Sequence, residues 1–173
     1  MRSDVLPWLE YCWTFDFPTG MFRAVLERLR GAPARLDELL RGAPPAALMR
    51  HEPGTWSAQE NAGHLWVVDA LWQIRIREFL AGAPALTAAD MSNRATEAGG
   101  YHGQPMPVIL AGFRAARGET VAMLDRLTLA DAGRLAHHPR LDREIRLVDL
   151  CFFAAEHDDH HLAVIREHLS AAP

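Results

Sequence analysis

Apolar residues recur at helical spacing in four separate segments of this chain, and this pattern limits the possible folds more than any other feature. The segments begin near residues 20, 57, 105 and 143. An α-helix turns about 100° per residue, so each segment would carry one apolar face, and such faces are stable only when they are buried. No segment alternates convincingly like a strand. We therefore expect an all-α, up-and-down four-helix bundle with antiparallel helices near 19–42, 57–80, 105–127 and 143–169, and no sheet.

Local signals set the helix ends. Ser57 and Glu60 form an S-x-x-E capping box at the start of the second segment. Pro33 lies inside the first segment and should kink or interrupt it, since proline has no N–H to donate. The second and third helices are joined by a long connection, residues 81–104. Such a segment is often functional. We expect it to reach the site, where a residue of the connection contacts a substrate or supplies a further ligand; the candidates are Asp90, Asn93 and His102.

Composition excludes several classes of function. The chain has 173 residues, 49 % hydrophobic and 23 % charged, which is typical of one globular domain over 1–173. A net charge of −4 argues against nucleic-acid binding. All 18 basic residues are arginines, so no lysine is present to form a Schiff base or a P-loop. No apolar run could span a membrane and no secretory signal is visible, so we expect a cytoplasmic protein.

The segment "FFAAEHDDHHLAVI", residues 152–165, places several polar side chains between apolar flanks. His157 and His161 are four residues apart and share one helix face with the apolar positions before them, so both should point inward. His160 is rotated away from that face, and Asp159 falls on the far side, where we expect it to be solvated. His64 lies on the second segment beside apolar neighbours and could meet the pair across the bundle.

Two interpretations of these histidines remain open at this point. Three neutral imidazoles converging from two helices can hold a divalent ion such as zinc, nickel or iron, with coordination positions left open. Alternatively they are core histidines that satisfy one another, since an H-x-x-x-H spacing is common in a chain with nine histidines. An unsatisfied buried polar group costs about 1–3 kcal/mol, so some partner is required in either case.

The remaining polar and aromatic residues have simpler interpretations. His51, His137 and His138 are expected in loops at the surface, and Cys151 should be a small buried hydrophobe. Trp66 and Trp72 should serve packing. Glu60 lies one turn from His64 and is therefore also a candidate acceptor for its second ring nitrogen.

Two stretches resemble the DinB-like (DNA-damage-inducible) four-helix bundle family. "WSAQENAGHLWVVDALW" is similar to that family's W-S-x-x-E-x-x-x-H-L helix, and "HPRLDREIRLVDLCFFAAEHDDHHLAVI" is similar to its last helix with H-x-x-x-H. The similarity extends over about 15–170 and leaves 1–14 as an N-terminal extension. It implies a divalent metal held by three histidines, which here are His64, His157 and His161, and often a homodimer.

Relatives with known activity include metal-dependent thiol transferases and a thiol-dependent isomerase. The resemblance thus implies a metal-dependent enzyme of the thiol-transferase or hydrolase type, acting on a small molecule with a low-molecular-weight thiol as a candidate partner. No catalytic residue is assigned by motif. The alternatives are a non-catalytic metal- or ligand-binding stress-response protein and a metal-free dimeric interaction module. We also predict a homodimer from the five tryptophans, which would leave apolar surface to cover.

Overall fold

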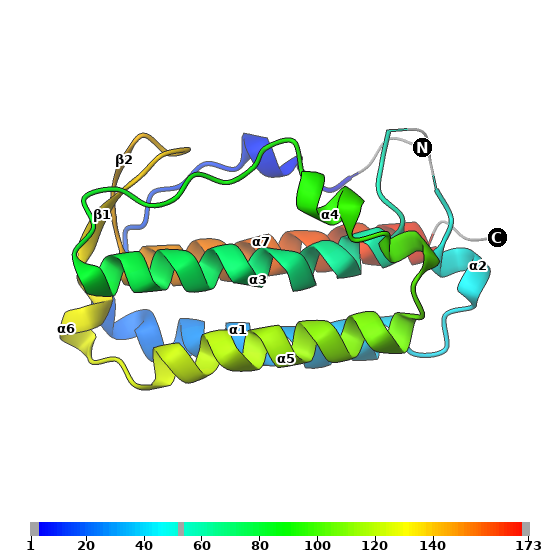
Figure 1. The fold of residues 1–173 in the computed structure, drawn as a ribbon, viewed down its shortest axis with the longest axis horizontal. Helices are drawn as coiled ribbons and strands as arrows, with labels where there is room; N and C mark the ends of the chain where they lie inside the picture. The colour runs from blue at the N-terminus through cyan, green and yellow to red at the C-terminus, as the bar shows by residue number, and fades with distance from the viewer. Residues whose placement is uncertain (1–3, 52–53, 171–173) are drawn as a thin grey trace.

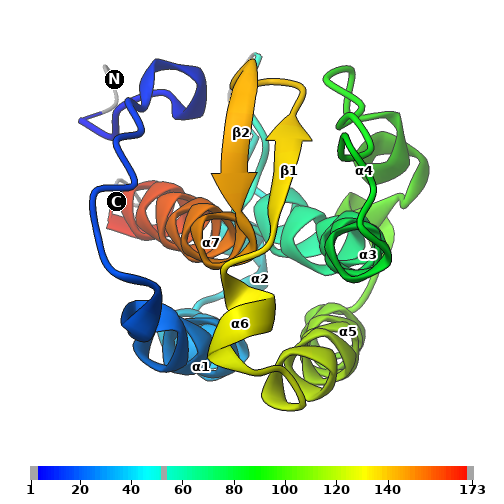
Figure 2. The same cartoon turned by 90° about the vertical axis from the view of Figure 1, so that its left-hand side faces the viewer.

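Four long helices form the molecule, as the sequence predicts. The computed structural model describes residues 4–51 and 54–170. The helices are α1 (Phe22–Leu40), α3 (Ala58–Ala81), α5 (Met106–Asp125) and α7 (Leu147–Ser170). Figures 1 and 2 show α3 and α7 in one layer and α1 and α5 in the layer beneath. The apolar faces meet between the layers, where residues such as Phe22, Phe79, Phe113 and Leu65 are fully buried.

The expected up-and-down order needs one correction. Figure 1 shows that the connection after α3 runs back along the bundle, so α5 starts at the end where α3 started and the two helices run in the same direction. A short loop would have forced an antiparallel pair, but this connection has the length to cross the molecule. It contains α4 (Arg94–Ala98) and the single turn η3 (Tyr101–Gly103).

A two-stranded sheet is present, so the expectation of no sheet was wrong. Strand β1 (Leu135–His138) pairs antiparallel with β2 (Arg143–Arg146), and α7 accordingly begins at Leu147 rather than near 143. Each strand has only four residues, too few for a recognisable alternation. The pattern also misleads, because Leu135 is exposed while His138 is 1 % exposed. His138 is therefore a buried strand residue and not the surface loop residue expected.

Three segments surround the outer face of α3 and α7. Figure 2 shows the N-terminal segment on the α7 side, the connection on the α3 side, and the hairpin between them. Further short elements complete the chain: η1 (Trp8–Glu10), η2 (Thr19–Met21), α2 (Pro45–Leu48) and α6 (Leu129–Ala132). Trp8 and Trp13 pack against Phe153 of α7. The N-terminal segment around Trp8 and Trp13 is thus part of the packed structure. Among the described residues no helix is long and apolar enough to cross a membrane.

The sequence predicts that Pro33 kinks or interrupts α1, but the helix is not interrupted and continues to Leu40. A contact across the bundle explains why. A residue with an N–H at position 33 would donate to the Leu29 carbonyl one turn earlier. The Arg117 guanidinium of α5 donates to that carbonyl instead, at 3.2 Å. Arg117 also binds Asp69 of α3 and Asp158 of α7. One buried side chain therefore contacts all four long helices and satisfies the carbonyl that the proline leaves free.

Candidate metal centre

His64 of α3 and His157 and His161 of α7 meet at one point, as predicted from their helix faces. The Nε2 atom of His157 lies 3.2 Å from that of His64 and 3.2 Å from that of His161. One ring nitrogen from each histidine falls in a cluster whose atoms lie within 4.8 Å of one another. The three side chains are 9 %, 6 % and 7 % exposed. The capping box at Ser57 and Glu60 is present and fixes the start of α3, and with it the position of His64.

The spacing of these nitrogens suits a metal ion. Zinc–nitrogen bonds of about 2.0–2.1 Å in tetrahedral geometry separate two ligand nitrogens by roughly 3.3 Å. The two observed Nε2–Nε2 distances of 3.2 Å are close to that value. The donor set fits a divalent ion with at least one further position open.

Asn61 fixes which nitrogen of His161 carries the proton. Its amide nitrogen donates to the carbonyls of Trp56 and Ser57 at 3.2 and 2.9 Å, so its oxygen is the atom that faces His161. That oxygen lies 2.8 Å from His161 Nδ1 and can only accept, so Nδ1 carries the hydrogen. The lone pair of His161 Nε2 then points into the cluster. Thr96 of α4 lies 2.8 Å from His64 Nδ1 in the corresponding place.

Burial keeps the three imidazoles neutral. It lowers the pKa of His64 to about 4, with a smaller contribution from His160. Burial likewise lowers the pKa of His157 and of His161 well below the usual value. Neutral imidazole is the form that binds metals. Three neutral imidazoles carry no positive charge that would repel a divalent cation at the point where their rings meet.

Several other predicted site residues lie elsewhere. Glu60 binds Ser57 and does not contact His64. Asp159 is half-buried and paired with Arg28 and Arg35 of α1, so it is not the solvated residue expected. His102 lies against His51, with 6.3 Å between ring centroids, and is not among the residues that line the cavity over the histidines.

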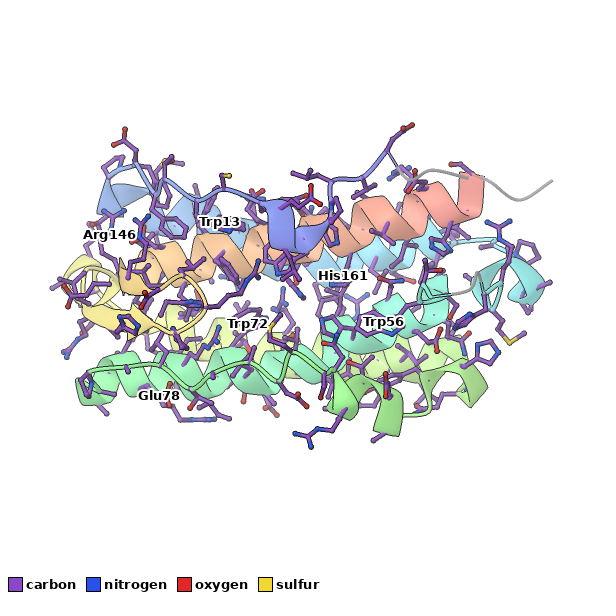
Figure 3. The ribbon with its side chains drawn as sticks, turned by 90° about the horizontal axis from the view of Figure 1, so that it is seen from above. Trp13, Trp56, Trp72, Glu78, Arg146 and His161 are labelled. Carbon is purple, nitrogen blue, oxygen red and sulfur yellow. The ribbon has the colours of Figure 1, made fainter. Side chains whose placement is uncertain are left out.

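A cavity of about 980 Å³ opens over the three histidines. Its walls combine aliphatic side chains with four aromatic ones, Trp8, Trp56, Trp72 and Phe153. Figure 3 shows Trp72, His161 and Trp56 following one another along the space between α3 and α7. Trp8 of the N-terminal segment lies 5.1 Å from the His157 ring. Asp90 and Asn93 of the connection line the cavity, as expected.

Three residues of this site were missed from the sequence. Asn61 precedes His64 by three residues, so helical spacing is the signal that could have placed it on the same face as His64. Thr96 and Trp8 reach the site through long-range packing, for which no local signal exists.

Comparison with known proteins identifies a family and a solved structure of similar fold. The DinB superfamily model matches residues 28–165. The structure is similar to that of YfiT from Bacillus subtilis, described as a probable metal-dependent hydrolase with an unusual four-helix bundle topology. The TM-score is 0.79 over 92 % of this chain and 91 % of YfiT, at 22 % sequence identity, a likeness that concerns the fold. No curated protein matches this chain. The match of the family model over most of the chain shows that this protein belongs to the DinB superfamily.

Proposed function

We propose that His64, His157 and His161 bind one divalent metal ion and that the protein is a metal-dependent enzyme acting on small molecules. The observation that carries this proposal is the set of three buried, neutral imidazoles whose Nε2 atoms face one another, with His161 held in the metal-binding tautomer by Asn61. The description of YfiT as a probable metal-dependent hydrolase supports the same class.

The protein contributes a site that binds and shields the substrate. A divalent ion held by three histidines acts as a Lewis acid and lowers the pKa of a water or thiol in its open positions. Cys151 is no alternative nucleophile, because burial raises the pKa of its thiol to about 12. Hydrolysis and transfer of a low-molecular-weight thiol are therefore the two reaction types proposed. The aliphatic and aromatic side chains of the cavity bind the apolar part of the substrate and exclude bulk water.

Metal content of three variants tests the ligand set. Protein purified without an affinity tag should contain about one zinc, nickel or iron per chain by elemental analysis. His64→Ala should lose it because α3 supplies no other ligand, and His161→Ala should lose it because α7 then offers only His157. His160→Ala is the matched control, since its ring lies 5.2 Å from that of His161 but belongs to no ligand cluster among the described residues. Loss of metal from His160→Ala with full retention in His161→Ala would contradict the proposed ligands.

Turnover separates the enzyme from a binding protein. Metal-loaded protein should either hydrolyse ester or amide substrates or consume a low-molecular-weight thiol in the presence of an electrophile, and chelation should abolish the reaction. Stoichiometric metal with no turnover in either assay would favour the alternative, a non-catalytic metal- or ligand-binding protein.

The homodimer remains a prediction from the family resemblance. Trp72 is buried and the other four tryptophans are half-buried in the structure, so they expose less apolar surface than expected. Light scattering at micromolar concentration should give twice the chain mass, and a monomeric mass would contradict the prediction.

A further inference from the structure

Arg75 of α3 is a buried cation that forms no ion pair with a carboxylate of the described residues. Its side chain is 1 % exposed. Its Nε donates to the Thr87 carbonyl at 2.9 Å, and its Nη1 lies 3.2 Å from Nε2 of His138. Its Nη2 has no hydrogen-bond partner in the part of the chain that the structure describes. The acidic group that raises the pKa of Arg75 is Glu78. Its carboxylate accepts hydrogen bonds from the backbone N–H and the hydroxyl of Thr87, and not from Arg75.

This arrangement is unfavourable by itself and differs from that of the other fully buried arginine. Burying an unpaired charge is costly, so proteins normally pair such groups. Arg117 follows that rule with two carboxylates, Asp69 and Asp158, which outweigh burial and raise its pKa. For Arg75, burial dominates and lowers the pKa to about 10, although Glu78 opposes the shift. The Trp72 ring, 5.6 Å from its guanidinium carbon, offers only a weak cation–π contact.

A second arginine lies at the same end of the cavity. Arg140, in the turn of the hairpin, is half-buried over the rings of Trp8 and Phe153, at 5.3 and 5.6 Å. One of its nitrogens donates to the Trp8 carbonyl at 3.1 Å. Arg140 is close enough to Arg75 to lower the pKa of that guanidinium further. Both arginines line the cavity, and neither pairs with a carboxylate in the described residues.

A single tryptophan ring lies between each of these two cations and the three-histidine site. The Trp72 ring that contacts Arg75 lies 5.8 Å from the His157 ring. The Trp8 ring that contacts Arg140 lies 5.1 Å from the same imidazole. Along the cavity, the three imidazoles are therefore followed by the rings of Trp8 and Trp72, and these rings by the two guanidinium groups.

We propose that Arg75 and Arg140 bind the carboxylate or phosphate group of a small organic ligand. Its apolar body would lie against Trp8, Trp72 and Phe153, and its other end would reach the histidines. The ligand class is then an anionic molecule with an aromatic or aliphatic body about one indole long. The substrate role of this ligand rests on the proposed function, but the arginine subsite does not require a bound metal.

Calorimetric binding to protein dialysed against a chelator tests the subsite apart from the metal. The probes are 3-phenylpropanoate, 2-phenylethylphosphonate and the neutral 3-phenylpropanamide. At least one anionic probe should bind wild-type protein tenfold or more tightly than the amide. Arg75→Met and Arg140→Met should each weaken that probe at least tenfold and leave the amide unchanged. Arg77→Met is the matched control, because Arg77 lies on the same helix but is exposed and outside the cavity.

Each outcome bears on the inference. Tighter binding of the phosphonate identifies a phosphate as the anionic group, and tighter binding of the carboxylate identifies a carboxylate. Equal affinity for the amide and both anions, or equal loss in Arg77→Met, overturns the subsite. Circular dichroism checks the fold of each variant. Should Arg75→Met unfold, Arg140→Met decides, since Arg140 is only half-buried and lies outside the long helices. If the protein binds an anionic probe but binds no divalent metal, the metal proposal is refuted and the arginine subsite stands.

Discussion

At the residue scale, Asn61 connects the start of α3 to the candidate metal ligands. Its amide is fixed by two backbone carbonyls and therefore holds His161 in one tautomer. Partners of this kind typically change metal affinity 10–100-fold when they are removed. Asn61→Leu should weaken zinc binding by roughly that factor, measured by competition with a chromogenic chelator.

Gln59→Leu is the matched control for Asn61. Gln59 is a buried amide on the same turn, but it donates to the carbonyls of Tyr101 and Gln104 and contacts no histidine ring. This variant should lose thermal stability and should weaken zinc binding less than Asn61→Leu does, because the connection that Gln59 holds supports His64 only through Thr96. Equal loss of affinity in both variants would mean that Asn61 acts through the fold rather than through His161.

At the element scale, a glycine of α3 allows the connection between α3 and α5 to pack closely against this helix. A Cβ atom on Gly63 would overlap the Tyr101 ring, so only glycine lets η3 approach the helix next to His64. Gly63→Ala should lower the free energy of unfolding by about 1–3 kcal/mol, as overpacking does. It should also weaken metal binding, since displacement of the connection removes Thr96 from His64.

Gly118→Ala provides the comparison for Gly63→Ala. Gly118 lies in the interior of α5, where a Cβ atom would meet no other atom within 4 Å, so alanine should raise stability by about 0.5–1 kcal/mol. Urea unfolding of both variants measures the difference. A stable Gly63→Ala with unchanged metal affinity would show that the connection does not depend on this contact.

Features set by local sequence could be predicted, whereas features set by contacts between distant segments could not. The faces of α3 and α7 follow from helical spacing, so the convergence of His64, His157 and His161 could be predicted. Asp158 and Asp159 show where that reasoning ends, because the arginines that pair with them come from α5 and α1. Contacts between distant segments also determine the hairpin, the path of the connection and the position of Trp8. No local pattern encodes such contacts.

At the scale of the whole molecule, the Arg117 cluster joins the four helices. Arg117→Met should leave Asp69 and Asp158 buried without their cation and lower the free energy of unfolding by about 3–5 kcal/mol. Arg114→Met is the control on the same helix, since its pair with Asp37 is exposed and should contribute less than about 1 kcal/mol. Chemical denaturation measures both, and equal losses would contradict the role of the cluster.

Four buried histidines should make the metal-free protein sensitive to acid. Burial lowers the pKa of His64 and of His138 to about 4, and that of His157 and His161 well below the usual value. In the unfolded chain each histidine has a pKa of about 6.5. Between these values the unfolded chain binds protons that the native state does not bind, so the free energy of unfolding falls as pH falls. The slope is up to about 1.4 kcal/mol per pH unit for each such histidine.

Urea unfolding in chelator at pH 7, 6 and 5 measures this slope and assigns part of it to one residue. His138→Gln should make the dependence shallower by up to one proton, because it removes one histidine that is buried and neutral in the native state. Added zinc should steepen the dependence, since protons then compete with the metal for three of the four histidines. Equal stability at pH 7 and pH 5 would be incompatible with four neutral histidines in the core.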